Sequence, residues 1–159
     1  MNKYMVLLLL CVLGVVNCKE SSVSDKRTLD LGHFLKEIKK DTANYQVVGV
    51  FDGSCSVCIA DFIEATMKFA EQEKNWNYPV TFVVETTDPI VFQSNIKQFS
   101  IKNTNVIVDT TYYISSHNIS FESSNIDIYL VDTNQNIIAK GNPFEDKKIW
   151  KLYEKYKKQ

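Results

Sequence analysis

The fold of this chain is decided by residues 45–58, YQVVGVFDGSCSVC. The first half, 45–51, is an apolar and largely β-branched run, typical of a short strand buried on both faces. Cys55 and Cys58 follow it and open an amphipathic segment that continues to about Lys74. A helix start offers unpaired N–H groups and the positive end of the dipole, which can lower a cysteine pKa from about 8.5 to roughly 3.5–7.5. The pattern predicts a redox-active dithiol with Cys55 as exposed nucleophile and Cys58 as buried resolving cysteine.

The segments around this unit alternate between helical and extended patterns. Before it, the apolar spacing of Leu31, Phe34, Leu35 and Ile38 indicates a helix that Thr28 or Asp30 can cap. After it, the helix predicted to begin at the cysteines would have an apolar face. This face would consist of Ile59, Phe62, Ile63, Thr66, Met67 and Ala70. Further on, the patterns predict a strand over 80–85, a helix from Pro89 to about Phe99 and a strand over 105–109. Residues 112–124 give no clear pattern.

The C-terminal third predicts a hairpin and a final helix. Residues 126–132 and 137–141 flank the turn 133–136, which is a hairpin pattern. Ile149, Leu152, Tyr153 and Tyr156 then mark an amphipathic helix. Strands that alternate with helices favour a parallel core, and the late hairpin adds an antiparallel edge. The order predicts an α/β fold.

Composition is consistent with one packed domain. The 159 residues are 45% hydrophobic and 23% charged, which provides a normal core. Acidic and basic residues nearly cancel, 19 against 18, and no basic patch stands out. We therefore expect no nucleic acid partner.

The N-terminus predicts export. The apolar run 5–16 follows Lys3, has the length of a signal h-region and is shorter than the ~20 residues of a spanning helix. Its end at Cys18 resembles a bacterial lipobox, with Asn17 in the place of the usual small residue. We expect a lipoprotein signal peptide over 1–17, lipidation of Cys18 as membrane anchor, a flexible tether over 18–27 and a domain over 28–159. The expected location is the Gram-negative cell envelope, facing the periplasm from the outer membrane; a plain secretory signal or an uncleaved anchor is the alternative.

From Val47 to Tyr156 the pattern resembles the thioredoxin fold, in particular the thioredoxin-like lipoproteins related to TlpA and the AhpC/TSA group. The resemblance rests on the strand, Cys55-Ser56-Val57-Cys58 and helix unit. Two further segments support it, Tyr129-Leu130-Val131-Asp132 with its turn and Lys140-Gly141-Asn142-Pro143 before the last helix. The resemblance implies a thioredoxin-like fold with a central mixed sheet flanked by helices and an antiparallel C-terminal hairpin. It also implies thiol-disulfide exchange on protein thiol and disulfide substrates, with a redox partner protein and without a cofactor or metal.

The chain departs from the family pattern at its substrate loop. The family carries a cis-proline just before the late strand, whereas this region reads Ser123-Ser124-Asn125-Ile126-Asp127. A cis bond without proline costs about 3 kcal/mol, so a differently shaped loop is expected. By the resemblance, Asn125, Ile126 and Asp127 form the substrate loop.

Two more departures lie beside the cysteines. The buried acid of classical thioredoxins falls at Gly49, which leaves Asp52 as a candidate proton acceptor for Cys58. The usual tryptophan before the first cysteine is Ser54. We expect the chemistry of the pair to be retained with altered efficiency or partner choice.

Two alternatives to thiol-disulfide exchange are a structural disulfide and a peroxidase. A structural disulfide is one alternative, although closing so short a loop adds little stability. A peroxidase of the AhpC/TSA type is disfavoured because Val48 and Asp52 replace the proline and threonine of its motif.

Two further classes of function remain. Copper delivery needs a third soft or imidazole ligand. The histidines are His33 and His117, and His117 is the one that could approach the cysteines. A non-catalytic binding module would use the aromatic segment around Tyr112, Tyr113 and Phe121.

Overall fold

A computed structural model describes residues 28–38, 43–99, 101, 104–118 and 126–157. Its centre is a five-stranded sheet in the order β3-β2-β1-β4-β5. The strands are β1 (Tyr45–Asp52), β2 (Val80–Glu85), β3 (Thr104–Asp109), β4 (Ile126–Asp132) and β5 (Ile137–Lys140). β1 pairs with β2 and β2 with β3 in parallel, whereas β1 with β4 and β4 with β5 are antiparallel. The predicted mixed sheet and C-terminal hairpin are confirmed.

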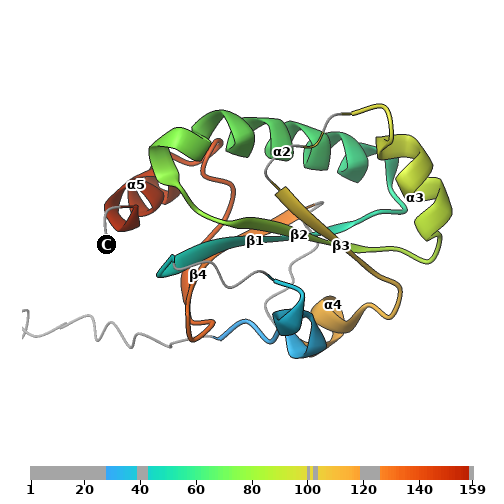
Figure 1. Cartoon of the computed structure of the whole chain (residues 1–159), viewed down its shortest axis with the longest axis horizontal. Coiled ribbons are helices and arrows are strands. Elements are labelled where there is room, and N and C mark those ends of the chain that lie inside the picture. Colours follow the sequence, from blue (N-terminus) through green and yellow to red (C-terminus); the bar gives the residue numbers. More distant parts are fainter. Residues whose placement is uncertain (1–27, 39–42, 100, 102–103, 119–125, 158–159) are drawn as a thin grey trace, which may run out of the picture.

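Helices cover both faces of the sheet (Figure 1). They are η1 (Gly32–Lys36), a 3-10 helix, and α2 (Ser56–Trp76), α3 (Pro89–Ile96), α4 (Tyr113–His117) and α5 (Lys147–Tyr156). α2, α3 and α5 pack on one face, and η1 and α4 on the other. The C-terminal end of β1, the central strand, leads directly into the start of α2. The cysteines therefore lie just beyond the end of that strand.

Two apolar cores lie on the two faces because side chains alternate along each strand. In β1, Val47 and Phe51 belong to the core under α2, and Val48 and Val50 to the core over η1 and α4. The first core is largely aromatic, which suits a long helix packed across a sheet. Its α2 members include Cys58, so one cysteine of the pair is a core residue.

The N-terminal segment differs from the predicted helix. Thr28 bridges to Asn136, and the amide of Leu29 donates to the Gln135 carbonyl over 2.9 Å. These contacts hold the chain extended, and Gly32 follows with a φ of +50° against the Tyr113 ring. Thr28 therefore does not cap a helix, whereas Asp30 accepts the Gly32 amide over 2.9 Å at the start of a short 3-10 helix over 32–36.

Two local predictions also need correction. Met67, predicted on the apolar face of α2, is 59% exposed, and Ala65 and Phe69 are buried instead. The helix from Pro89 ends at Ile96 instead of Phe99. Part of the unassigned segment forms α4, which Asp109 caps from the end of β3.

The predictions for the N-terminus lie outside the described residues, including the signal peptide, the tether and lipidation at Cys18. Within the described part of the chain, no helix is both long and apolar enough to cross a membrane.

Candidate functional site: a dithiol at the start of α2

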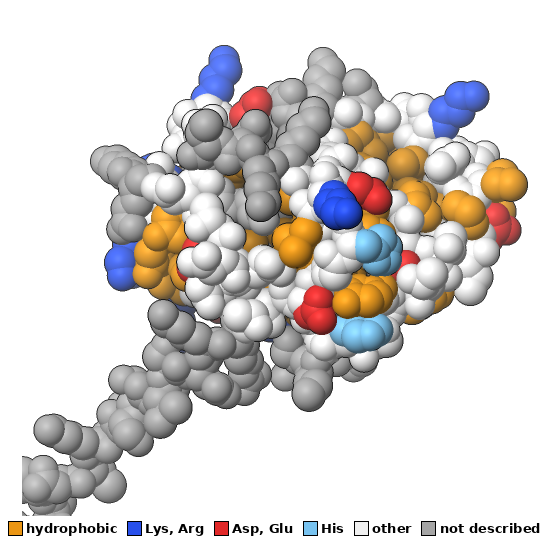
Figure 2. All heavy atoms as spheres, turned by 60° about the horizontal axis from the view of Figure 1, so that its bottom comes forward, with side chains coloured by type: hydrophobic (Ala, Val, Ile, Leu, Met, Phe, Trp, Pro, Cys, Tyr) orange, Lys and Arg blue, Asp and Glu red, His pale blue; other side chains and the backbone are white. Residues whose placement is uncertain are grey.

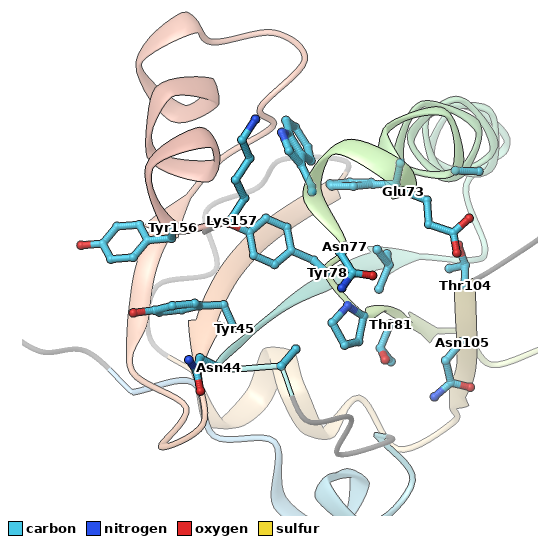
Figure 3. A pocket seen from close by; sticks show the side chains of 16 residues that line it. Asn44, Tyr45, Glu73, Asn77, Tyr78, Thr81, Thr104, Asn105, Tyr156 and Lys157 are labelled. Carbon is cyan, nitrogen blue, oxygen red and sulfur yellow. The ribbon is translucent and has the colours of Figure 1, made fainter. Parts of the chain in front are cut away.

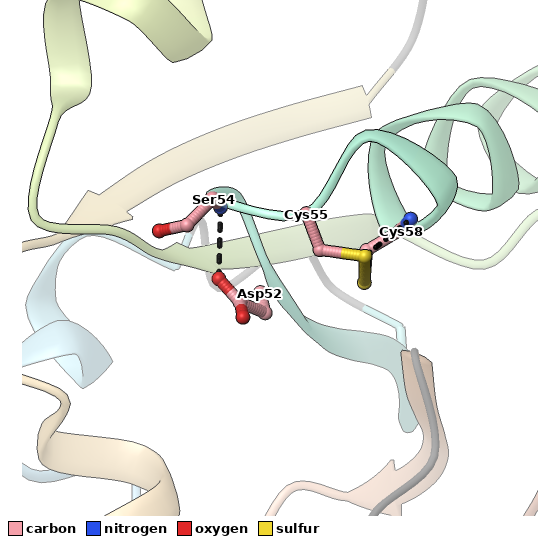
Figure 4. The surroundings of a disulfide bond; sticks show 4 residues. All are labelled: Asp52, Ser54, Cys55 and Cys58. Atoms are coloured by element: carbon pink, nitrogen blue, oxygen red, sulfur yellow. Dashed lines mark hydrogen bonds between the residues drawn. A yellow bond between two sulfur atoms is a disulfide. The ribbon is translucent and has the colours of Figure 1, made fainter.

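A tight turn carries the chain from β1 to the cysteines. Asp52 ends β1, and its Oδ1 accepts a hydrogen bond from the Ser54 amide over 2.8 Å (Figure 4). The Gly53 amide donates to the Glu85 carbonyl at the end of β2 over 2.8 Å. A Cβ on Gly53 would lie 2.5 Å from Cγ1 of Val84, so the turn can approach β2 this closely only with glycine.

Cys55 is the N-cap residue of α2. Its Sγ accepts a hydrogen bond from the Cys58 amide over 3.3 Å, which satisfies one of the free N–H groups of the first turn. This places the sulfur at the positive end of a helix of 21 residues. Both the hydrogen bond and the dipole favour the thiolate over the thiol.

The two cysteines form a disulfide with a Cα–Cα distance of 5.1 Å (Figure 4). Cys55 is half-buried, whereas Cys58 is 4% exposed. A substrate can therefore reach Cys55 more readily than Cys58. The geometry suits a nucleophile followed by a resolving cysteine.

An aromatic cluster fills the space behind Cys58. Phe51 and Phe62 stack with ring centroids 4.4 Å apart, and Phe82 meets Phe62 edge-on at 5.3 Å. A Cβ on Gly49 would lie 2.2 Å from the ring of Phe82, its partner on β2. Phe82 thus occupies the space that a buried acid at position 49 would need.

Thr86 is a supporting residue that sequence reasoning missed. It is 1% exposed, and its Oγ1 lies 3.4 Å from Oγ of Ser54, the residue before Cys55. The same Oγ1 accepts a hydrogen bond from the Asp88 amide over 3.1 Å at the start of α3. Thr86 therefore ties the cysteine turn to α3. The only sequence signal, a threonine before Asp88 and Pro89, was interpreted as part of a helix cap.

Solved structures of low sequence identity share the fold of this chain. The pneumococcal exposed lipoprotein thioredoxin Etrx1 from Streptococcus pneumoniae matches with a TM-score of 0.54 and 18% identity, over 76% of this chain and 88% of its own. A domain proposed to be a thiol-disulfide isomerase from Cytophaga hutchinsonii gives 0.57 and 17%, over 73% and 79%. A protein proposed to be the thiol:disulfide interchange protein DsbE from Chlorobium tepidum gives 0.56 and 12%, over 77% and 84%.

The fold is thioredoxin-like. No protein-family model and no curated protein sequence matches the chain. The predicted resemblance therefore holds at the level of the fold, and the thioredoxin-like architecture explains why a strand, a cysteine pair and a helix follow one another here.

In this thioredoxin-like fold, the candidate proton acceptor Asp52 lies on the face of β1 away from Cys58. Strand alternation places Asp52 with Val48 and Val50, whereas Phe51 faces the core that contains Cys58. Its carboxylate is turned toward the Ser54 amide (Figure 4). The role of Asp52 stays a prediction.

The described residues of the predicted substrate loop lie on opposite faces of the sheet. Asn125 lies outside the described residues. Ile126 packs against the core that contains Cys58, so it lies on the face of the cysteines. Asp127 lies on the other face, is 6% exposed and has Oδ1 3.4 Å from Nζ of Lys140. Of the described residues of this loop, only Ile126 lies on the same face of the sheet as Cys58.

The histidines lie on the face of the sheet opposite to α2. His117 stacks on Tyr113 with centroids 4.0 Å apart, and His33 meets the same ring edge-on at 5.5 Å. Figure 2 shows both histidines together on this face. The structure does not bring His117 to the cysteines, and the described residues contain no group of three metal-ligating side chains. Tyr113 is half-buried in these contacts, and Phe121 lies outside the described residues.

A buried carboxylate anchors the start of α4 on this face. Asp109 accepts hydrogen bonds from the Thr111 side chain over 2.6 Å and from the Tyr113 amide over 2.7 Å. Burial by itself raises the pKa of Asp109, but these bonds and those from the amides of Thr111 and Ile114 outweigh it and lower the pKa below its usual value. Asp109 is therefore a structural acid and is not placed for chemistry on the sulfurs.

A polar pocket of about 780 Å³ lies at the other end of the sheet (Figure 3). Tyr45 and Tyr156 form one side of it, and Glu73 and Thr104 lie across from them. The pocket lies at the C-terminal end of α2, and the length of this helix separates it from Cys55. Its lining contains no cysteine or histidine, so it is separate from the dithiol.

Proposed function

We propose that this protein is an exported thiol-disulfide oxidoreductase of the cell envelope, anchored by a lipid on Cys18. One observation carries the proposal. Cys55 caps α2, its sulfur accepts a hydrogen bond from the Cys58 amide, and the two cysteines form a disulfide beyond the C-terminal end of β1 in a thioredoxin-like fold. Such placement lowers the pKa of an attacking cysteine and pairs it with a resolving cysteine.

The exchange proceeds in two displacements. The Cys55 thiolate attacks one sulfur of a protein disulfide, and a mixed disulfide forms as the other sulfur leaves as a thiolate. Cys58 then loses its proton and attacks Sγ of Cys55. The Cys55–Cys58 bond forms, the substrate sulfur leaves with the electron pair, and the substrate is reduced by two electrons. A redox partner protein reverses these steps to regenerate the dithiol.

Two features support the envelope location. The leader over 1–17 ends at Cys18 in a lipobox-like pattern. Etrx1, which has the same fold, is described as an exposed lipoprotein. We place the protein as a lipoprotein in the outer membrane of a Gram-negative cell, where it would face the periplasm.

Insulin reduction and alkylation trapping test the exchange. We expect the wild-type protein to reduce insulin with dithiothreitol as electron source, and Cys55→Ser to abolish this activity because the attacking sulfur is gone. Cys58→Ser is the matched variant: it should accumulate a mixed disulfide at Cys55 that a gel shift after alkylation detects.

The opposite result identifies the alternative functions. If Cys55→Ser reduces insulin as well as wild type, the pair does not turn over. A pull-down that captures the same partner when both cysteines are serine would instead indicate a non-catalytic binding module.

A further inference from the structure

The outer side of α5 carries a cluster of lysines. The segment 147–157 contains five lysines and one glutamate, although the whole chain has a net charge of −1. At 3.6 residues per turn, four of these lysines fall within about 100° of the helix circumference. All four are exposed, and we call them the lysine face of α5: Lys147, Lys148, Lys151 and Lys155. Along the sequence they alternate with apolar residues, so only the helix brings them together.

The lysine face points away from the core and its charge is not compensated. Tyr153, which is 0% exposed, lies across the helix from the middle of this face. Glu154 borders the face, but it accepts hydrogen bonds from Nε1 of Trp76 and from Nζ of Lys157. Within the described residues, none of the four lysines takes part in an ion pair. The face therefore presents four positive charges to the surroundings.

The start of the domain lies at the same end of the sheet as the C-terminal end of α5. Thr28 bridges to Asn136 in the turn after β4. Tyr45 at the start of β1 pairs with Asp132 at the end of β4, and its ring centroid lies 5.0 Å from that of Tyr156 in α5. The cysteine turn follows the opposite end of β1, whose 8 residues span about 26 Å. Figure 1 shows α5 and the start of the described chain at one end of the molecule and the start of α2 at the other.

We propose that the lysine face of α5 docks on anionic lipid headgroups of the membrane that holds Cys18, an inference that rests on the proposed lipid anchor. Lysines near an anionic membrane surface are attracted to it, and each contributes roughly fivefold to the partition of the protein. The residues 18–27 reach at most about 35 Å when fully extended, which keeps the domain concentrated at the membrane. Docking leaves the cysteine turn at the end of the domain away from the anchor, where protein substrates have access to it.

Co-sedimentation with lipid vesicles tests the lysine face without the anchor. The protein is the mature chain 18–159 with Cys18→Ser, which prevents lipidation. The vesicles consist of phosphatidylcholine alone or of equal parts phosphatidylcholine and phosphatidylglycerol. We expect binding to the anionic vesicles only, and its loss at high salt because ions screen the charges. Lys148→Gln combined with Lys151→Gln should weaken this binding by about 25-fold, since two contributions of roughly fivefold are removed.

A second double variant is the matched control. Lys36→Gln combined with Lys97→Gln changes the net charge by the same amount, and both lysines are exposed outside α5. This control should bind the anionic vesicles nearly as well as wild type. An equal loss of binding in the two double variants would overturn the proposal, because net charge alone would then explain it. Absence of wild-type binding to the anionic vesicles would also overturn it and would favour an acidic protein as the partner of this face.

The vesicle assay uses neither the lipid anchor nor the cysteine chemistry. A protein that reduces insulin but does not bind anionic vesicles therefore refutes the docking of α5 and leaves the proposed exchange intact. Mass spectrometry of the membrane-extracted full chain tests the anchor separately. Absence of an acyl chain on Cys18 would refute the proposed anchor, and the vesicle result for α5 would still stand.

Discussion

At the scale of single residues, Gly49 and Phe82 together decide what fills the core beside the cysteine turn. Gly49 has no side chain, and the ring of its β2 partner Phe82 takes the freed space. The ring then packs against Phe51 and Phe62 under the cysteine turn. An apolar contact thus fills this part of the interior, where an ionisable group would be costly to bury.

The close contact between Gly49 and the Phe82 ring predicts the effect of adding one methyl group at position 49. Gly49→Ala should destabilise the protein by about 1–3 kcal/mol because the new Cβ overlaps the Phe82 ring. Urea unfolding of the two proteins measures the difference. In a Phe82→Leu background the same Gly49→Ala change should cost less, since the smaller side chain leaves room. An equal cost in both backgrounds would show that the ring is not the cause.

At the scale of elements, carboxylates at the strand ends hold α4 in place. Asp109 from β3 caps the helix through the Tyr113 amide, and Glu85 from β2 accepts the Ser115 amide over 2.8 Å. Asn118 closes its far end, with Oδ1 accepting the Asp30 amide and Nδ2 donating to the carbonyls of Asp30 and Ile114. A helix of only five residues depends on such contacts because it is too short to be stable alone.

The lowered pKa of Asp109 predicts a pH-dependent contribution to stability. Asp109→Asn should lower the free energy of unfolding by about 1–2 kcal/mol at pH 7, because an amide cannot accept all the bonds that the carboxylate accepts. The folded pKa lies below the unfolded value of about 3.9. The contribution is therefore complete above that pH and is lost as the pH falls through the folded pKa.

Urea unfolding at pH 7 and near pH 3 tests this expectation. The gap between wild type and Asp109→Asn should narrow at the lower pH. Asp88→Asn is the matched control: Asp88 caps α3 through the Val91 amide over 3.0 Å at an exposed site, and asparagine caps a helix equally well. A gap that stays constant with pH would contradict the assignment to ionised Asp109.

At the scale of the whole molecule, α2 connects two distinct regions. Its start carries the cysteines, and its end packs with α5 through an aromatic cluster. Trp76 lies 4.6 Å from Trp150 and 5.2 Å from Tyr153 between ring centroids, and its Nε1 donates to Oε1 of Glu154 over 2.6 Å. Tyr78 adds a bond from its hydroxyl to the Tyr153 carbonyl over 2.7 Å. These contacts hold α5 to the rest of the fold.

This separation predicts how tryptophan fluorescence responds to the disulfide. The chain has 2 tryptophans, and both belong to the α5 cluster. Trp76 ends α2, whose 21 residues place it about 30 Å from the cysteine turn. Reduction of the disulfide should therefore leave the emission spectrum unchanged, whereas Phe144→Ala, beside Trp76, should shift it. A redox-dependent spectrum would show that the disulfide and α5 are coupled.

Periodicity and residue type were sufficient to predict most of the architecture. The continuous apolar run 45–51 indicated a central strand, and the turn 133–136 indicated a hairpin, because burial on both faces and tight turns leave local patterns. The position of Cys55 and Cys58 at the start of a helix followed from the same patterns. Local patterns failed at residues 28–30, where a bridge to Asn136 holds the chain extended, and at Met67, whose place on α2 depends on what packs against it.

The sequence by itself determined the mixed α/β fold and the placement of a cysteine pair at the end of a buried strand. Only the tertiary structure decided which groups meet that pair. It placed Phe82 in the space of an acid at position 49, Asp127 and His117 on the far face, and Ile126 on the same face of the sheet as Cys58. The physical reason is that strand and helix patterns are local in sequence, whereas the neighbours of a sulfur atom come from strand register and from helices distant in the chain.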